Sequence, residues 1–440
     1  MEKLWDNGRL QVMDNGHYFA NGDKPLFWIG DTAWTLFQKM SVEEGYRYLR
    51  NRKDKGFNFI YCTLINFQQR DEDTSFSLSG DKDVSEFFDE KHIPYWEEIH
   101  KVVKRAEELG LYLGLLPVWG NVVKSERLHM DNVQEYVDFL YENFKDYKNI
   151  VWVVGGDSRG DEFNDVWNAL GEKIKAKMPD HLVGYHPFGR TSSSYWFHDK
   201  EWLDFNMFQS GHRRTDQRDL GAWDEIDSKE PWHGERNYRY VQEDYKLTPA
   251  KPVLDGEPSY EQIPQGLHDP VEPFWQDYHV RRYAYWSSFA GAAGHIYGHN
   301  AIIQFYGTGR GPVYGAKETW DLAMHDVGAA QMKILKDVMD EIDFANGVPM
   351  QDYVENPEPE VQEESLVAFG SEEKFACYNF GSVDITVKKL TGRYDCYWID
   401  PVSGVKSYHD TVNIAENPTF TVPNKKSTWN DWILLLEKVK

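Results

Sequence analysis

Two stretches decide the fold, Ile150-Val-Trp-Val-Val-Gly-Gly-Asp157 and Pro252-Val-Leu-Asp-Gly-Glu257, because in each a short apolar run ends in glycine and a carboxylate. Runs that are apolar at every position are typical of parallel strands, which are buried on both faces. In a parallel barrel all strands open onto one face at their C-terminal ends. The two stretches therefore predict a barrel in which Asp157 and Glu257 meet, although they lie far apart in the chain.

Further apolar runs of the same kind alternate with helix signals along the chain. The expected strands are one that ends at Asp31, followed by 57–65, 111–116, 150–154, 182–185, 205–208, 252–254 and 291–297. Eight strands that alternate with helices predict an α/β fold, the (β/α)8 TIM barrel. A doubly wound open sheet is the alternative, but no glycine-rich phosphate loop follows the first strand to support it.

Helix start and stop signals lie between the apolar runs. Ser41-Val-Glu-Glu44 forms a capping box, and Pro94 opens a helix that is expected to end at Gly110. Asp131 is expected to cap the next helix. The last helix of this region is expected near 318–342. These signals place helices where a barrel requires them.

Beyond that helix the pattern changes to short alternating segments that glycine and proline interrupt. The expected strands are 366–369, 375–378, 393–398 and 432–436. Such segments predict a small antiparallel β-sandwich. We expect the boundary within 346–359, which gives a barrel domain with a short N-terminal β prelude in 1–345 and a sandwich domain in 346–440.

Composition limits the classes of partner. The net charge of −24, with Lys and Arg mostly single or in pairs, argues against nucleic acid and favours a neutral ligand. The 17 Trp exceed what packing alone requires and are typical of sugar binding. Three scattered cysteines make no metal cluster or disulfide framework. No apolar leader or membrane span is found, so we expect a cytoplasmic protein without a membrane partner or a cofactor.

Glycoside hydrolysis needs an acid that protonates the leaving oxygen and a second carboxylate on the other face of the sugar. Asp157 and Glu257 fit best, because each follows a buried strand and a glycine that lets a ligand approach the backbone. We assign Asp157 as acid/base and Glu257 as nucleophile. The reverse assignment stays open, since a sequence does not show which carboxyl has the raised pKa. Asp255, two residues before Glu257, is a competing candidate.

Other strand ends supply aromatic and polar side chains that could bind a sugar. The substrate-binding candidates are Asp31, Trp34, Asn66, Trp119, His186, Gln209, His212, Tyr260 and His299. The long segments 68–93 and 213–231 are expected to shape the pocket. We predict no metal; the alternative is a zinc site in which His186 and His212 converge with Asp157. A serine hydrolase lacks support, because there is no Gly-x-Ser-x-Gly motif.

These motifs together resemble the apiosidase-like glycoside hydrolases, a family related in fold to the cellulase clan. The matching stretches are 21–34, 48–58, 151–157, 208–212 and 254–260. The resemblance implies that the aspartate of Gly-Gly-Asp and the glutamate of Gly-Glu-Pro, here Asp157 and Glu257, form the catalytic pair. The tail from 345 onwards resembles a collagen-binding-type β-sandwich, which we expect to stabilise the barrel rather than to bind collagen.

We therefore expect a retaining, exo-acting glycoside hydrolase whose carbohydrate substrate is a plant-derived oligosaccharide or glycoside. The alternatives are an inverting or endo-acting, cellulase-like hydrolase, and a non-catalytic carbohydrate-binding barrel whose carboxylates only accept hydrogen bonds. A separation of about 6.5 to 9.5 Å between the carboxyl groups would favour inversion, and about 5 to 5.5 Å would favour retention.

Overall fold

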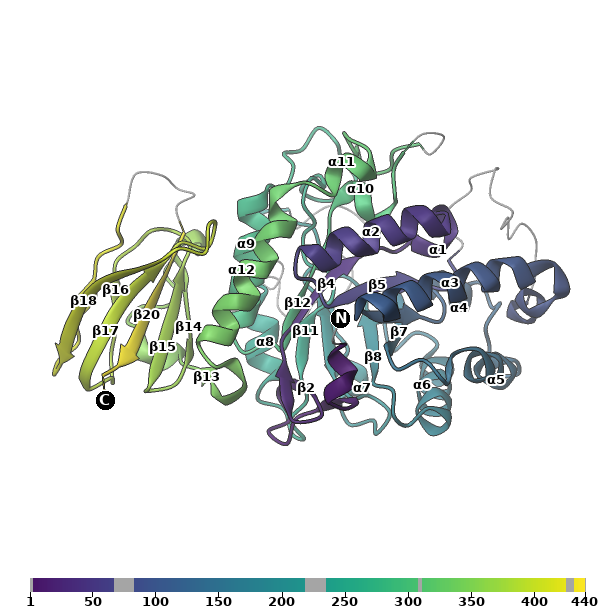
Figure 1. Cartoon of the computed structure of the whole chain (residues 1–440), viewed down its shortest axis with the longest axis horizontal. Coiled ribbons are helices and arrows are strands. Elements are labelled where there is room, and N and C mark those ends of the chain that lie inside the picture. The colour runs from purple at the N-terminus through teal and green to yellow at the C-terminus, as the bar shows by residue number, and fades with distance from the viewer. Residues whose placement is uncertain (1–2, 67–82, 218–234, 308–310, 425–430, 440) are drawn as a thin grey trace.

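The computed structural model describes residues 3–66, 83–217, 235–307, 311–424 and 431–439 (Figure 1). In this part of the chain, parallel strands form a nearly closed barrel with the order β8-β7-β6-β5-β4-β12-β11-β10. The strands are β4 (Trp28–Thr32), β5 (Phe59–Thr63), β6 (Tyr112–Leu116), β7 (Ile150–Ser158), β8 (Val183–Pro187), β10 (Asn206–Gln209), β11 (Val253–Asp255) and β12 (Gly294–Tyr297). The last strand, β12, pairs with the first, β4, which confirms the predicted barrel and contradicts the open sheet.

Helices surround this barrel in Figure 1. They are α1 (Leu36–Lys39), α2 (Val42–Asp54), α3 (Ile93–Leu109), α4 (Gly120–Lys124), α5 (Val133–Phe144), α6 (Asn164–Lys177), α7 (Ser194–Phe197), α8 (Tyr238–Asp244), α9 (Asp277–Phe289), α10 (Asn300–Ile303), α11 (Trp320–Ala323) and α12 (Val327–Glu341). Short 3₁₀ helices are η1 (Leu4–Asn7), η2 (Val84–Phe88), η3 (Glu90–His92), η4 (Phe344–Asn346), η5 (Gln351–Tyr353) and η6 (Gln362–Glu364). Each helix in the described residues is too short or too polar to cross a lipid bilayer.

The predicted helix ends are confirmed at α2 and α3 and corrected elsewhere. Ser41 and Glu44 form the capping box of α2, and α3 ends at Gly110 in the left-handed conformation. Helix α5 has Asn132 rather than Asp131 at its N-cap. The single helix expected over 318–342 is two helices, because the chain is extended at Asp326, where α12 begins.

Smaller strands complete the N-terminal part of the chain. The β prelude is an antiparallel sheet of β1 (Leu10–Val12), β2 (Phe19–Asn21) and β3 (Lys24–Leu26). A short strand that the sequence did not predict, β9 (Thr191–Ser192), pairs antiparallel with β10 at the open seam of the barrel. Strands β8 and β10 flank this seam.

The C-terminal part has the predicted antiparallel strands. Its larger sheet has the order β13-β14-β15-β20-β17-β18, and its smaller sheet pairs β16 with β19. The strands are β13 (Val348–Pro349), β14 (Leu366–Gly370), β15 (Lys374–Asn379), β16 (Ile385–Thr386), β17 (Gly392–Ile399), β18 (Lys406–Ile414), β19 (Thr419–Phe420) and β20 (Trp432–Lys438). This part lies beside α9 and α12 in Figure 1.

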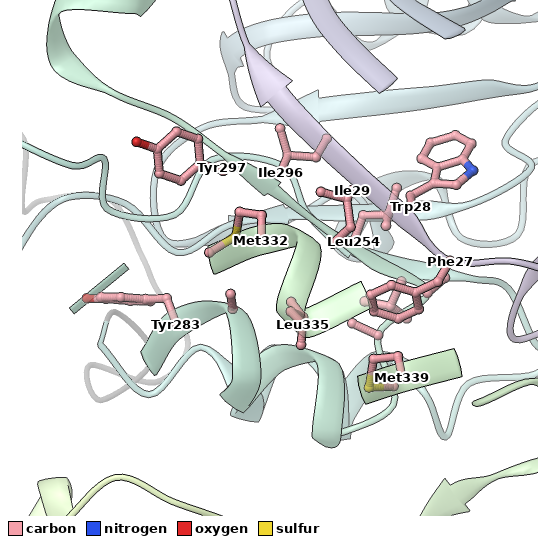
Figure 2. Packing of buried hydrophobic residues seen from close by; sticks show 14 of the residues in the cluster. Phe27, Trp28, Ile29, Leu254, Tyr283, Ile296, Tyr297, Met332, Leu335 and Met339 are labelled. Carbon is pink, nitrogen blue, oxygen red and sulfur yellow. The ribbon is translucent and has the colours of Figure 1, made fainter. Parts of the chain in front are cut away.

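One apolar core continues from the barrel into the sandwich. Figure 2 shows Met332, Leu335 and Met339 of α12 packed below Ile29 of β4 and Leu254 of β11. Their spacing of three and four residues puts them on one face of the helix. The opposite side of this helical layer meets the sandwich, whose residues on that face belong to the same apolar cluster. The sandwich has a second apolar cluster of its own, so the two parts share a buried apolar interface.

Polar contacts reinforce the junction of barrel and sandwich. The guanidinium of Arg281 on α9 donates two hydrogen bonds of 2.8 Å to the carboxylate of Asp431, and both side chains are buried. The ring of Tyr285 stacks on that of Tyr378 with centroids 4.7 Å apart. A buried charge requires a close partner, so this pair fixes how the sandwich docks on the barrel.

Candidate active site

Two adjoining cavities lie at the C-terminal ends of the barrel strands. The larger has a volume of about 280 Å³ and the smaller about 130 Å³. The residues that line both are Trp119, Asp157, His212, Glu257, Leu267 and Tyr314. The two carboxylates predicted from strand ends thus stand where the cavities meet.

Backbone geometry explains the Gly-Gly-Asp sequence at the end of β7. Gly155 and Gly156 have φ angles of 102° and 101°, which side chains rarely adopt. A Cβ atom on Gly155 would lie 2.3 Å from the carbonyl oxygen of His186, and one on Gly156 would lie 2.8 Å from the Trp119 ring. Asp157 itself has φ 45°. The two glycines let the chain turn sharply and present the Asp157 side chain to the cavities.

Two imidazoles face the carboxylate of Glu257. The Nε2 atom of His212 lies 2.9 Å from Oε1, and the Nε2 atom of His186 lies 3.3 Å from Oε2. The backbone N–H of Gly211 donates to the Glu257 carbonyl oxygen at 3.0 Å, which ties the end of β10 to the end of β11. Glu257 is 6% exposed. Its Oε1 atom is hydrogen-bonded to His212, whereas Oε2 and the facing Nε2 atom of His186 have no hydrogen-bond partner among the described residues.

The two carboxyl groups lie close together. One oxygen of Asp157, one oxygen of Glu257 and one ring nitrogen of His186 all lie within 4.8 Å of one another. At least one oxygen of each carboxyl group is therefore near the other group. The geometry allows one carboxyl to reach a sugar carbon while the other reaches the oxygen attached to it.

The surroundings move the two pKa values in opposite directions. Burial, followed by the negative charge of Glu257, raises the pKa of Asp157 to about 6, although a hydrogen bond from Gln209 opposes this. Burial would also raise the pKa of Glu257, but the neighbouring imidazoles of His186 and His212 outweigh it and lower that pKa to about 2. The two shifts favour a protonated Asp157 beside an ionised Glu257.

Most of the predicted sugar-binding residues come together at these cavities. Trp34, Asn66 and Tyr260 line the smaller cavity, Gln209 lines the larger, and Trp119 and His212 line both. His186 is fully buried beneath Glu257. Residues chosen because they lie at or just after the ends of β4, β5, β7, β8, β10 and β11, and Trp119 in the turn before α4, are thus found at or next to the cavities.

Three strand-end residues point elsewhere. Asp31 is fully buried, pairs with Arg52 of α2 and lines neither cavity. His299 caps α10 and its Nε2 atom lies 3.0 Å from a carboxylate oxygen of Asp326, also away from both cavities. Asp255, the competing candidate, is buried and accepts hydrogen bonds of 2.8 Å from the side chains of Ser210 and Asn237.

Several cavity residues were missed by reasoning from sequence. They include Asn121 and Lys124 of α4, Phe188, Arg190 and His268 at the larger cavity, and Thr35, Ile263, Ile303, Gln304 and Val313 at the smaller one, with Leu267 and Tyr314 at both. Arg213, the first residue of the segment 213–231 that was expected to shape the pocket, lines the larger cavity. Phe188 carries a weak signal, since it directly follows β8. The rest lie in loops or short helices without a recognisable pattern. Of the segments expected to shape the pocket, residues 67–82 and 218–234 lie outside the described part of the chain.

Three residues of the site are arranged so that they could hold a metal ion. Asp157, His186 and Glu257 are close enough to share one, so the expected absence of a metal stays a prediction. Beside them, the Nε2 atom of His212 donates a hydrogen bond of 2.9 Å to the ionised Glu257 carboxylate, so one of the Glu257 oxygens already has a partner. A second cluster includes His299 and Asp326. There Nδ1 of the imidazole accepts a backbone N–H, which leaves the hydrogen on Nε2.

Comparisons with known proteins agree with this architecture. The family model described as "Apiosidase-like, catalytic domain" matches residues 13–346, and the model "Putative collagen-binding domain of a collagenase" matches residues 348–437. A search of curated proteins gave no match.

Two solved structures are similar over nearly the whole chain. One, described as "Glycoside hydrolase", is 37% identical with a TM-score of 0.92 and covers 100% of this chain and 98% of its own. The other, a glycoside hydrolase family 5 structure from Bacteroides vulgatus ATCC 8482, is 36% identical with a TM-score of 0.91 and covers 99% and 95%. The chain therefore belongs to the apiosidase-like glycoside hydrolases, and its substrates are carbohydrates.

Proposed function

We propose that this chain is a retaining, exo-acting glycoside hydrolase with Asp157 as acid/base and Glu257 as nucleophile. The observation that carries the proposal is that one carboxylate oxygen of Asp157 and one of Glu257 lie within 4.8 Å of each other. Inverting enzymes need room for a water molecule and hold their carboxyl groups about 6.5 to 9.5 Å apart. The opposite pKa shifts support the same division of roles, since the first step needs one protonated and one ionised group.

The reaction then proceeds by two displacements. A carboxylate oxygen of Glu257 forms a bond to the anomeric carbon while the bond to the leaving oxygen breaks and Asp157 donates its proton to that oxygen. In the second step Asp157 takes a proton from water, and the water oxygen displaces Glu257 from the sugar. The imidazoles of His186 and His212 stabilise the Glu257 carboxylate as it leaves.

Cavity size supports exo action. The smaller cavity has a volume of about 130 Å³, less than half that of the larger one at about 280 Å³. The aromatic side chains of Trp34 and Tyr260 line it. One terminal sugar would occupy the smaller cavity, and the leaving group would occupy the larger one. A plant-derived oligosaccharide or glycoside is the proposed substrate; the cytoplasmic location and the domain division at 345/346 stay predictions.

The first test is hydrolysis of a substrate panel. Aryl glycosides and plant oligosaccharides, including apiosides, arabinofuranosides and β-glucosides, are incubated with the wild type, Glu257→Gln and Asp157→Asn, and released sugar is followed by chromatography. Glu162→Gln, which removes an exposed carboxylate five residues after Asp157, is the control. We expect release by the wild type and the control only. Binding without release by any variant would favour the non-catalytic alternative.

Stereochemistry and chemical rescue separate the mechanisms. NMR of the first-formed sugar should show the same anomeric configuration as the substrate, whereas an inverted product would refute retention. Azide should rescue Asp157→Ala on an activated aryl glycoside and give a glycosyl azide of retained configuration, because the small anion enters the space of the missing carboxylate. If azide rescues Glu257→Ala and the glycosyl azide formed has the inverted anomeric configuration, Glu257 is the nucleophile.

A further inference from the structure

Lys124 contacts the backbone of Asp157 from outside the strand. It is the last residue of α4, and its Nζ atom donates a hydrogen bond of 2.9 Å to the Asp157 carbonyl oxygen. Helix α4 lies directly against this turn, since a Cβ atom on Gly120 would come within 2.2 Å of the carbonyl oxygen of Gly156 and 2.1 Å of Oγ of Ser158. The lysine therefore reaches Asp157 from a rigid and closely packed element.

The contact matters because Asp157 has an unfavourable backbone conformation. Its φ of 45° lies in the left-handed region, which non-glycine residues adopt only when the surrounding structure holds them there. Among the described residues, Oδ1 of Asp157 has no hydrogen-bond partner. The direction of the carboxyl group thus depends on Gln209, which donates a hydrogen bond to it, and on how the backbone is held. The Lys124 ammonium holds the carbonyl oxygen of that same residue.

The ammonium also adds a positive charge beside the carboxyl group. The titratable groups with an electrostatic effect on Asp157, or on which Asp157 acts, are Glu257 after β11, His186 on β8, Lys124 on α4, Tyr61 on β5, and Tyr260 and Tyr314 in loops. Burial and Glu257 raise the pKa of Asp157, whereas His186 and Lys124 lower it. His186 is buried and Lys124 is exposed, so the lysine can be replaced without opening the core.

We propose that Lys124 is a positioning residue for Asp157, whose ammonium holds the aspartate backbone in the left-handed conformation that directs its carboxyl toward Glu257. The inference rests on the proposed function of Asp157 as acid/base. A competing role also exists, because Lys124 lines the larger cavity and could touch a leaving group. Direct binding would raise KM, whereas positioning affects kcat and the titration of Asp157.

The first measurement needs no substrate. The protein is labelled with ¹³C at its aspartate carboxyl groups, and NMR follows their titration in the wild type and three variants. The signal of Asp157 is identified as the one that is lost in Asp157→Asn. Lys124→Met removes the charge and the donor at similar length, Lys124→Arg keeps both, and Lys104→Met on α3 removes an exposed lysine away from the site. We expect the pKa of Asp157 to rise by about half a unit to one unit only in Lys124→Met. An unchanged titration in that variant overturns the proposal.

The second measurement uses a pair of aryl glycosides of one sugar from the panel. With 4-methoxyphenolate, a poor leaving group, kcat of Lys124→Met should fall about tenfold with KM within about twofold, because proton donation limits this step. With 2,4-dinitrophenolate, which leaves without a proton, glycosylation should change less than about twofold. Lys124→Arg should recover most of the loss. A rise in KM with unchanged kcat refutes positioning. Full activity of Asp157→Asn would refute the proposed function but not the effect of Lys124 on Asp157, because the NMR titration does not depend on activity.

Discussion

The two opposed pKa values predict a specific pH dependence. The first displacement requires Asp157 to be protonated, with its pKa near 6, and Glu257 to be ionised, with its pKa near 2. Raising the pH above 6 removes the proton from Asp157 and leaves Glu257 unchanged. We therefore expect kcat/KM to be level between these values and to fall on the alkaline side, because this ratio reports the ionisation of the free enzyme.

The size of the fall follows from the protonated fraction of Asp157. With a pKa of about 6, roughly one tenth of the molecules carry the proton at pH 7 and about one hundredth at pH 8. For a substrate whose leaving group needs a proton, kcat/KM should fall by the same factors. Burial and the charge of Glu257 both contribute to the raised value, so removing Glu257 should shift the Asp157 titration to lower pH.

The assay compares two leaving groups over pH 4 to 9 in buffers of constant ionic strength. The 4-methoxyphenyl glycoside should lose activity tenfold per pH unit above pH 6, and the 2,4-dinitrophenyl glycoside should lose much less. Asp157→Asn should remove the alkaline limb with the dinitrophenyl substrate. A level profile from pH 6 to 8 with the methoxyphenyl substrate would refute the assignment of Asp157 as the acid.

Three other predictions concern the framework. Arg281→Met leaves the buried carboxylate of Asp431 without a cationic partner, with only the hydroxyl of Tyr378 donating to it; the free energy of unfolding in urea should fall by about 3 to 5 kcal/mol, and a fall below about 1 kcal/mol would contradict a tight junction. Gly156→Ala places a Cβ atom against the Trp119 ring at a positive φ; kcat should fall by about tenfold to a hundredfold while circular dichroism stays unchanged. Deleting 348–440 uncovers the apolar face shared with the sandwich, so light scattering should show aggregation; a soluble, active barrel would disprove the shared apolar interface.

Much of the fold could be predicted because strands buried on both faces are apolar at every position. The run at 150–154 and its equivalents are therefore visible without any alignment. Helix ends were less certain where two capping residues adjoin, as with Asp131 and Asn132. The break at Asp326 was missed because apolar residues keep helical spacing on both sides of it. A local sequence pattern indicates which residues are buried and which can cap a helix. Where two neighbouring residues can both cap a helix, or where a helix can either continue or break, the tertiary structure decides between them.

The site shows the same limit at the level of side chains. Strand-end position predicted that Asp157 and Glu257 reach one face, and both line the cavities. Asp31 occupies the same kind of position, yet it turns to Arg52, which lies on the helix that follows β4. The position of a residue at a strand end determines how far along the barrel axis it lies. The direction of a buried charged side chain such as Asp31 depends instead on where its partner of opposite charge lies. That partner is found only once helix and strand are packed.

The question that the sequence left open, which carboxyl is the acid, depends on two residues predicted to bind sugar. His186 and His212 come from separate strand ends, and both direct Nε2 at Glu257. If Glu257 carried the acid proton on Oε1, it would lose the hydrogen bond from His212; on Oε2 the proton would lie against the Nε2 atom of His186, 3.3 Å away. Burial and the negative charge of Glu257 instead favour the neutral form of Asp157. The imidazoles therefore favour Glu257 as the nucleophile, although neither would enter into a bond with the sugar.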